Sequence, residues 1–153
     1  MDGRLHRLMG WAGFAVVTVL LVSACSQAPS RTSGASMTGA SNSVALTGEQ
    51  EVPPVSTQAT GVSNIEFLGD KVVMGSVKTS NLNGTAAHIH MGPKGQNGPV
   101  IVTLVKSGQD TWVVPGNTEL SSAQLAALKS GELYVNVHSA AHPNGEIRAQ
   151  LMP

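Results

Sequence analysis

Cysteine, aromatic residues and charged residues are all scarce in this sequence. Cys25 is the single cysteine, so no disulfide can form within the chain. Aromatic residues make up 3% and charged residues 12% of the 153 residues, and nine Lys and Arg balance nine Asp and Glu. Such a neutral chain lacks the basic footprint of a nucleic-acid-binding protein. We therefore expect no nucleic-acid partner and a fold that is held together by its hydrophobic core alone.

The longest apolar stretch lies near the N-terminus, from Met9 to Val22, after Arg4 and Arg7. A charged start followed by a short apolar run is typical of a secretory signal peptide, and a membrane span would need about 20 apolar residues. The run leads into Val22-Ser23-Ala24-Cys25, which resembles the lipobox at which signal peptidase cuts before an acylated cysteine. We expect residues 1–25 to be a lipoprotein signal peptide, and the exported protein to be anchored through Cys25, in the periplasm or at the cell surface.

A polar segment follows the lipobox and precedes the part of the chain that can form a core. Residues 26–43 are dominated by Ser, Gly, Ala and Thr. Such a composition buries too little apolar surface to offset the entropy of ordering, which predicts a flexible tether. Residues 44–153 then have the length of one domain.

Alternating apolar residues predict that this domain is built from short strands. Turn sequences rich in Gly, Pro and Asn separate the strands, for example Asn97-Gly98-Pro99 and Pro143-Asn144-Gly145. The expected strands include Ile65 to Phe67, Val73 to Val77, Thr85 to Met91, Val100 to Leu104, Trp112 to Val114, Leu133 to Val137, and Ile147 to Leu151. Short strands at this spacing favour an all-β, antiparallel sandwich or barrel.

One helix is expected to interrupt the strands after Leu120. Ser121 can cap its N-terminus while Gln124 reaches back, and Leu120 can pack on Leu125 as a hydrophobic staple. Gly131 stands where a left-handed residue usually ends a helix. We expect the helix to play a structural role, as a lid or crossover that leads into the next strand.

Four of the five histidines fall in two short segments of this domain. Strand alternation places His88 and His90 on one face of their strand, with Ile89 and Met91 on the other. The same alternation assigns His138 to the outward, polar face of its strand. If the two strands run in the same direction, their histidines can meet at one rim of the sheet.

These histidines predict a metal site. Three or four neutral imidazoles suit copper or zinc, and the expected ligands are His88, His90, His138 and His142. Tyr134 and Asn136 share the outward face of the second strand and are expected to support the ligands. Asp70, Asp110 and Glu146 are alternative ligands or supporting groups. The alternative reading is that the histidines merely contribute polarity to the protein surface.

Four ordered motifs also resemble the CHRD family, the domain first named from chordin. They are Leu46-Thr47-Gly48-Glu49-Gln50-Glu51-Val52-Pro53-Pro54, the segment from His88-Ile89-His90 to Gly98-Pro99-Val100, Tyr134-Val135-Asn136-Val137-His138, and Pro143-Asn144-Gly145-Glu146-Ile147-Arg148. The sequence departs from the family pattern at Ala149, where Gly is usual. The resemblance implies an immunoglobulin-like or superoxide-dismutase-like sandwich with no established catalytic activity. It also implies that Glu51 and Arg148 are structural partners.

We therefore expect an extracytoplasmic, lipid-anchored and non-catalytic protein that binds copper or zinc through its histidines. The alternative is a metal-independent interaction or adhesion module of the cell envelope, because chordin binds growth factors, although a shared fold does not settle function. An enzyme is the third reading, as a copper-dependent redox catalyst. No Ser-His-Asp order, reactive thiol of the mature domain or phosphate loop favours other chemistry.

Overall fold

The fold is an antiparallel, all-β sandwich with one short α-helix, as the sequence predicts. The structure is a computed structural model that describes residues 43–69 and 71–153. Its strands are β1 (Ser43–Thr47), β2 (Thr60–Leu68), β3 (Val72–Ser80), β4 (Gly84–Met91), β5 (Val100–Thr103), β6 (Val105–Lys106), β7 (Thr111–Val113), β8 (Thr118–Glu119), β9 (Leu133–Ser139) and β10 (Ile147–Leu151). The short 3-10 helix η1 (Gly48–Gln50) follows β1, and α1 (Ser122–Lys129) precedes β9. Among the described residues, no helix has the length and apolar character to cross a membrane.

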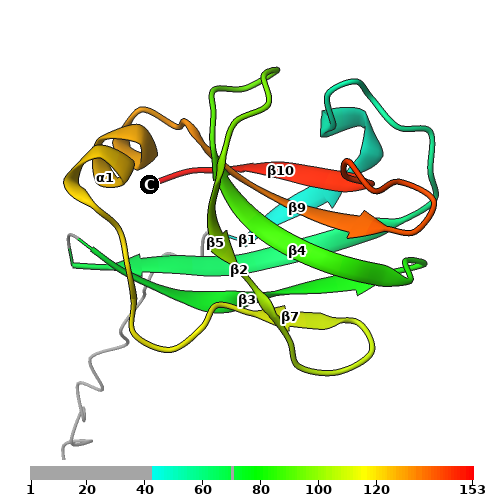
Figure 1. The fold of residues 1–153 in the computed structure, drawn as a ribbon, viewed down its shortest axis with the longest axis horizontal. Coiled ribbons are helices and arrows are strands. Elements are labelled where there is room, and N and C mark those ends of the chain that lie inside the picture. The colour runs from blue at the N-terminus through cyan, green and yellow to red at the C-terminus, as the bar shows by residue number, and fades with distance from the viewer. Residues whose placement is uncertain (1–42, 70) are drawn as a thin grey trace, which may run out of the picture. The chain divides into compact units, whose positions relative to one another are not determined.

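The strands form two layers that belong to one hydrogen-bonded sheet. One layer contains β5, β4, β9 and β10, the other contains β2, β3, β7 and β6, and β1 pairs with both β10 and β2 (Figure 1). The two ends of this order, β5 and β6, are separated in the chain by Leu104 alone. The Leu104 backbone N–H donates to the Ala87 carbonyl at 2.9 Å. The continuous chain from β5 through Leu104 to β6 therefore joins the two layers and closes this edge of the sandwich.

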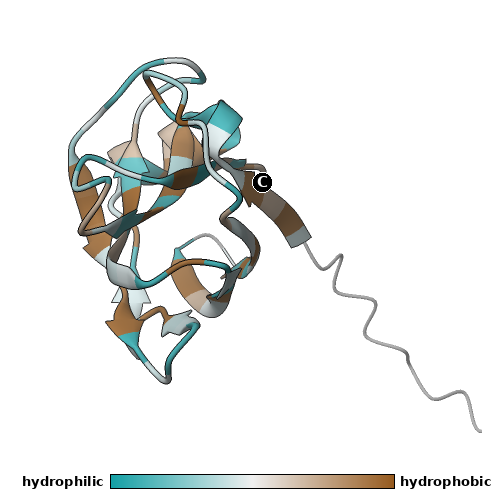
Figure 2. Cartoon of the chain, turned by 90° about the vertical axis from the view of Figure 1, so that its right-hand side faces the viewer, coloured by the Kyte–Doolittle hydropathy of each residue, from teal (hydrophilic) through white to brown (hydrophobic). Residues whose placement is uncertain are grey.

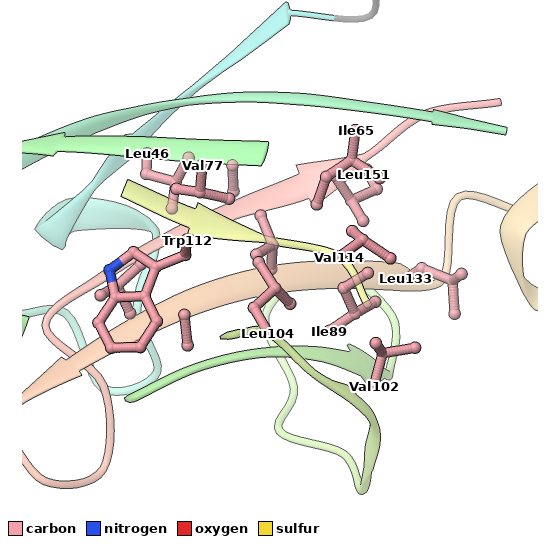
Figure 3. Close-up of a cluster of buried hydrophobic side chains, with 14 of the residues drawn as sticks. Leu46, Ile65, Val77, Ile89, Val102, Leu104, Trp112, Val114, Leu133 and Leu151 are labelled. Atoms are coloured by element: carbon pink, nitrogen blue, oxygen red, sulfur yellow. The ribbon is translucent and has the colours of Figure 1, made fainter. Parts of the chain in front are cut away.

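The hydrophobic core lies between the layers and follows the predicted alternation. Leu46, Ile65 and Val77 from one side face Ile89 and Val102 from the other (Figure 3), and each is 9% exposed or less. Burying a Val, Leu or Ile side chain contributes about 1.5 to 3 kcal/mol, so this core can hold the domain without a disulfide. Colouring by hydropathy shows apolar segments on the strands and polar residues in most of the loops (Figure 2).

The helix confirms the capping signals of its sequence. The Ser121 side chain accepts a hydrogen bond from the Gln124 backbone N–H, and the Gln124 side chain accepts one from the Ser121 N–H. Gly131 has a φ of +69°, the left-handed conformation expected after a helix. The helix ends just before β9, so it leads directly into the strand that carries His138.

Other sequence predictions lie partly or wholly outside this fold. The predicted signal peptide, Cys25 and the tether up to residue 42 lie outside the described residues. Ser43, which was assigned to the tether, begins β1. The alternation did not reveal β1, β6 or β8. Strands β6 and β8 have two residues each, which is too short to show a period.

Candidate metal centre

The pairing of β4 with β9 brings three histidines together. The strands are antiparallel, with His88 opposite Asn136 and Ala86 opposite His138. His88 and His138 are therefore diagonal neighbours on one face, within reach of each other's side chains. The condition under which the sequence let the histidines meet, strands that run in the same direction, does not hold. The two strands are adjacent and antiparallel, and their side chains meet across the sheet rather than at a shared rim.

The three imidazoles are close enough to bind one ion. His88 Nδ1 lies 2.9 Å from His138 Nε2, and one nitrogen from each of His88, His90 and His138 lies within 4.8 Å of the others. Metal–nitrogen bonds near 2 Å place two ligand nitrogens about 3 to 4 Å apart. The His88–His138 distance is close to this range, and one nitrogen of His90 lies within 4.8 Å of both.

Backbone carbonyls fix the tautomers of two of these rings. His90 Nδ1 lies 2.9 Å from the Gly98 carbonyl oxygen, and His138 Nδ1 lies 3.0 Å from that of Pro143. Because a carbonyl only accepts, each Nδ1 carries the proton and each Nε2 keeps its lone pair. Ligand histidines in metalloproteins usually donate their second N–H in this way. His90 Nε2 is buried and has no hydrogen-bond partner, so a ligand atom at this position is left unsatisfied by the protein.

Burial keeps the three imidazoles neutral. Burial is the largest cause that lowers the pKa of each of His88, His90 and His138 below 6.5, and neighbouring positive charge lowers it further. Carbonyl contacts with Gly98 and Pro143 oppose the shift for His90 and His138 without reversing it. Neutral rings are the form that binds metal. Because His138 Nε2 accepts, His88 Nδ1 donates the hydrogen bond between these two rings, and binding through His88 Nδ1 requires the other His88 tautomer.

The polar face that carries the histidines is itself buried, contrary to the sequence prediction that it points outward. Tyr134 and Asn136 are 2% and 3% exposed. Tyr134 stacks on His90 with ring centroids 4.7 Å apart, and the Arg148 guanidinium lies 3.4 Å from the Tyr134 ring centroid. The loop after β4 covers this stack, because Arg148 donates to the Gln96 carbonyl at 2.9 Å and to Asn97 Oδ1 at 3.2 Å. A second, polar core therefore lies outside the apolar one.

Glu51 closes one end of this polar core. Its side chain is 4% exposed, and burial raises its pKa from 4.5 to about 7, against the lowering effects of Arg148, the Val52 backbone and Asn136. A Cβ atom at Gly145 would lie 2.5 Å from Glu51 Oε1 and 2.8 Å from Asn136 Nδ2. Gly145, at φ +129°, thus permits the carboxyl and the carboxamide to converge beneath the turn. The resemblance paired Glu51 with Arg148, whereas the alternation of strands gave no signal for Glu51.

The other candidate residues are placed apart from the three histidines. His142 lies in the turn after β9, where its backbone N–H donates to the Ser139 carbonyl at 3.2 Å, and it is not a member of the histidine group. Glu146 accepts hydrogen bonds from the Thr57 and Ser139 hydroxyls and is not a member either. Asp70 lies outside the described residues. The candidate site therefore contains three histidines. Tyr134 stacks on His90, and Asn136 lies opposite His88 in the strand pairing.

Comparison with known proteins agrees with this architecture. The CHRD domain family matches residues 42–151, which include nearly all of the described chain. No curated protein and no solved structure is similar enough to the chain to count as a match. CHRD is a β domain of the extracellular type. The chain belongs to the CHRD domain family.

Proposed function

We propose that this protein binds a copper or zinc ion through His88, His90 and His138, without catalysing a reaction, on the outer side of a cell membrane. The best support for the proposal is the environment of His90. Its Nε2 is buried and has no hydrogen-bond partner, while its Nδ1 donates to the Gly98 carbonyl. A buried polar atom without a partner costs about 1 to 3 kcal/mol, and a metal ion would remove that cost.

The donor set favours copper or zinc over other ions. Three imidazole nitrogens form a borderline-soft site, whereas calcium and magnesium require oxygen ligands. The three-histidine group contains no carboxylate, so a divalent ion would keep its positive charge and an open position for water or an anion. His88 is half-buried, so one side of the three-histidine group borders the solvent.

Titration of the purified, metal-free protein with Cu(II) and Zn(II) tests the proposal. We expect about one ion per chain, and loss of binding in the double variant His88→Ala with His138→Ala. His142→Ala is the matched control, because it removes an imidazole from the adjacent turn and not from the group. Stoichiometry well below one, or equal binding by the double variant and the control, would contradict the proposal.

Lipid anchoring forms the second part of the proposal, and it is supported by the sequence before Cys25. Several acyl chains on one cysteine would hold a domain at a membrane, since each buried CH₂ contributes about 0.8 kcal/mol. Labelling of producing cells with a radioactive fatty acid tests it. We expect the label on the wild-type protein and none on Cys25→Ser. A labelled Cys25→Ser protein would place the lipid elsewhere.

A metal-independent interaction module of the cell envelope remains the second candidate. It is favoured by exposed apolar side chains near the turn between β2 and β3, where Leu68, Val72 and Met74 are 48%, 39% and 45% exposed. Capture of an envelope protein by chelator-treated bait tests this candidate. Capture that is lost in Leu68→Ser with Met74→Ser supports it, and the same capture by that variant contradicts it.

A further inference from the structure

Three buried polar atoms without hydrogen-bond partners lie in the polar core between the histidines and Glu51. They are His90 Nε2, Asn136 Oδ1 and Glu51 Oε1. All three side chains are 8% exposed or less. In the neutral, Nδ1-protonated form of His90, and with Glu51 ionised, all three atoms are acceptors. Adjacent acceptors with no proton among them cannot satisfy one another.

The Asn136 carboxamide connects the other two groups. It lowers the pKa of Glu51 and opposes the lowering of the His90 pKa, although His90 Nε2 and Asn136 Oδ1 form no hydrogen bond in the structure. Its Nδ2 and Glu51 Oε1 converge on the same position beside Gly145. A carboxamide offers a donor on one side and an acceptor on the other, and a half-turn of the group exchanges them.

Two arrangements pair the three groups differently. Without metal, Asn136 Nδ2 donates to His90 Nε2, and Asn136 Oδ1 accepts the proton of a neutral Glu51. With metal on His90, the carboxamide is turned so that Nδ2 donates to an ionised Glu51. Each arrangement requires a different protonation state of Glu51, and the positive charge of the ion and of Arg148 favours the ionised state in the second.

We propose that Glu51 is a proton site linked to the metal site, and that metal binding releases its proton through a half-turn of the Asn136 carboxamide. This inference rests on the proposed metal function. The bond that breaks is Glu51 O–H, its proton leaves to solvent, and the carboxylate gains the hydrogen bond from Asn136. Its exit is short, because Glu51 lines a cavity of about 250 Å³ beside the turn after β9.

Other charged and titratable groups also face Glu51. They are Glu49 in η1, Lys94 in the loop after β4, His142 in the turn after β9, and Arg148 in β10. The experiment must therefore isolate the Glu51 proton from theirs. A comparison of wild type with Glu51→Gln does so, because the remaining groups are the same in both proteins.

Calorimetry of Zn(II) binding in two buffers of different ionisation enthalpy counts the protons released per ion. Near pH 7, where the Glu51 carboxyl is half-titrated, we expect wild type to release about half a proton more than Glu51→Gln. Glu49→Gln makes the same change at an exposed position two residues away and should match wild type. Equal proton release by wild type and Glu51→Gln would overturn the inference while leaving the metal site intact. Absence of any zinc binding by wild type would overturn the proposed function and the inference together.

Infrared spectroscopy tests the proposal on the wild-type protein alone, so it can be used even if Glu51→Gln does not fold. A protonated carboxyl has a C=O band that imidazole lacks, so the signal reports on carboxyl groups and not on the histidines. At pH 6.5 ordinary carboxyls, with pKa values of about 4, are ionised. We expect zinc to remove one protonated-carboxyl band at this pH, and a spectrum without this loss would contradict the proposed proton release.

Discussion

Glu51 should make the stability of the metal-free protein depend on pH in a direction opposite to that of most carboxylates. Its pKa is 4.5 in the unfolded chain and about 7 in the folded one. Between these values the folded protein holds a proton that the unfolded chain has released, so the free energy of unfolding falls as the pH rises from 4.5 to about 7. The full shift corresponds to about 3 kcal/mol, and allowance for solvent screening reduces it to about 2 kcal/mol.

The measurement compares urea unfolding of wild type and Glu51→Gln at pH 5 and at pH 8, with a chelator present. The amide does not titrate, so the stability of Glu51→Gln relative to wild type should rise by about 2 kcal/mol between the two pH values. Histidine contributions cancel because both proteins contain the same histidines. Glu49→Gln serves as the control for the chemical change at an exposed position. A difference between wild type and Glu51→Gln that does not change with pH would refute a buried, protonated Glu51.

Three further predictions concern the polar core. Gly145→Ala should destabilise the protein by about 1 to 3 kcal/mol in urea unfolding, because a Cβ at φ +129° would overlap Glu51 Oε1; Gly116→Ala, in open space, is the control, and equal costs would contradict the argument. Tyr134→Phe should weaken zinc binding about 10-fold in a competition assay. The Tyr134 hydroxyl accepts a hydrogen bond from the Gly98 N–H at 3.1 Å, and the carbonyl of the same Gly98 orients His90. Unchanged affinity would contradict this prediction. In Glu51→Gln, zinc affinity should remain constant down to about pH 6.5 and fall only at lower pH, because burial lowers the pKa values of the histidines; a decline already at pH 7.5 would contradict this.

The sequence predicted the fold class, most strands and the helix, because these depend on local patterns. Alternation placed Ile89 on the apolar side of β4 and His88 on the other, and the capping signals at Ser121 identified the start of α1. Each of these signals depends on residues that are only a few positions apart in the chain. The register between β4 and β9 cannot be read from such local signals, because it joins positions fifty residues apart. Alternation and spacing therefore nominated His88, His90 and His138 as candidate ligands, together with His142, but did not give the antiparallel pairing that brings the first three together.

Burial of the polar face could not be predicted for a related reason. Alternation distinguishes two faces of a strand, but it does not show whether a loop covers the polar one. Here the loop after β4 folds back over Tyr134 and is held by Arg148, which lies more than fifty residues later in the chain. A surface histidine and a histidine beneath such a loop have the same local sequence. Only the second has a shifted pKa and an unsatisfied nitrogen.

Arg148 connects the covering loop to the proposed metal site. Its guanidinium stacks on Tyr134 and donates to loop oxygens at Gln96 and Asn97, so folding itself orders the loop. The same loop supplies the Gly98 carbonyl that fixes the tautomer of His90. The entropy of ordering the ligand is therefore lost when the chain folds rather than when the ion binds, which favours binding by a preorganised site. The buried cation would also repel a metal ion, and the proton release proposed for Glu51 would offset that repulsion.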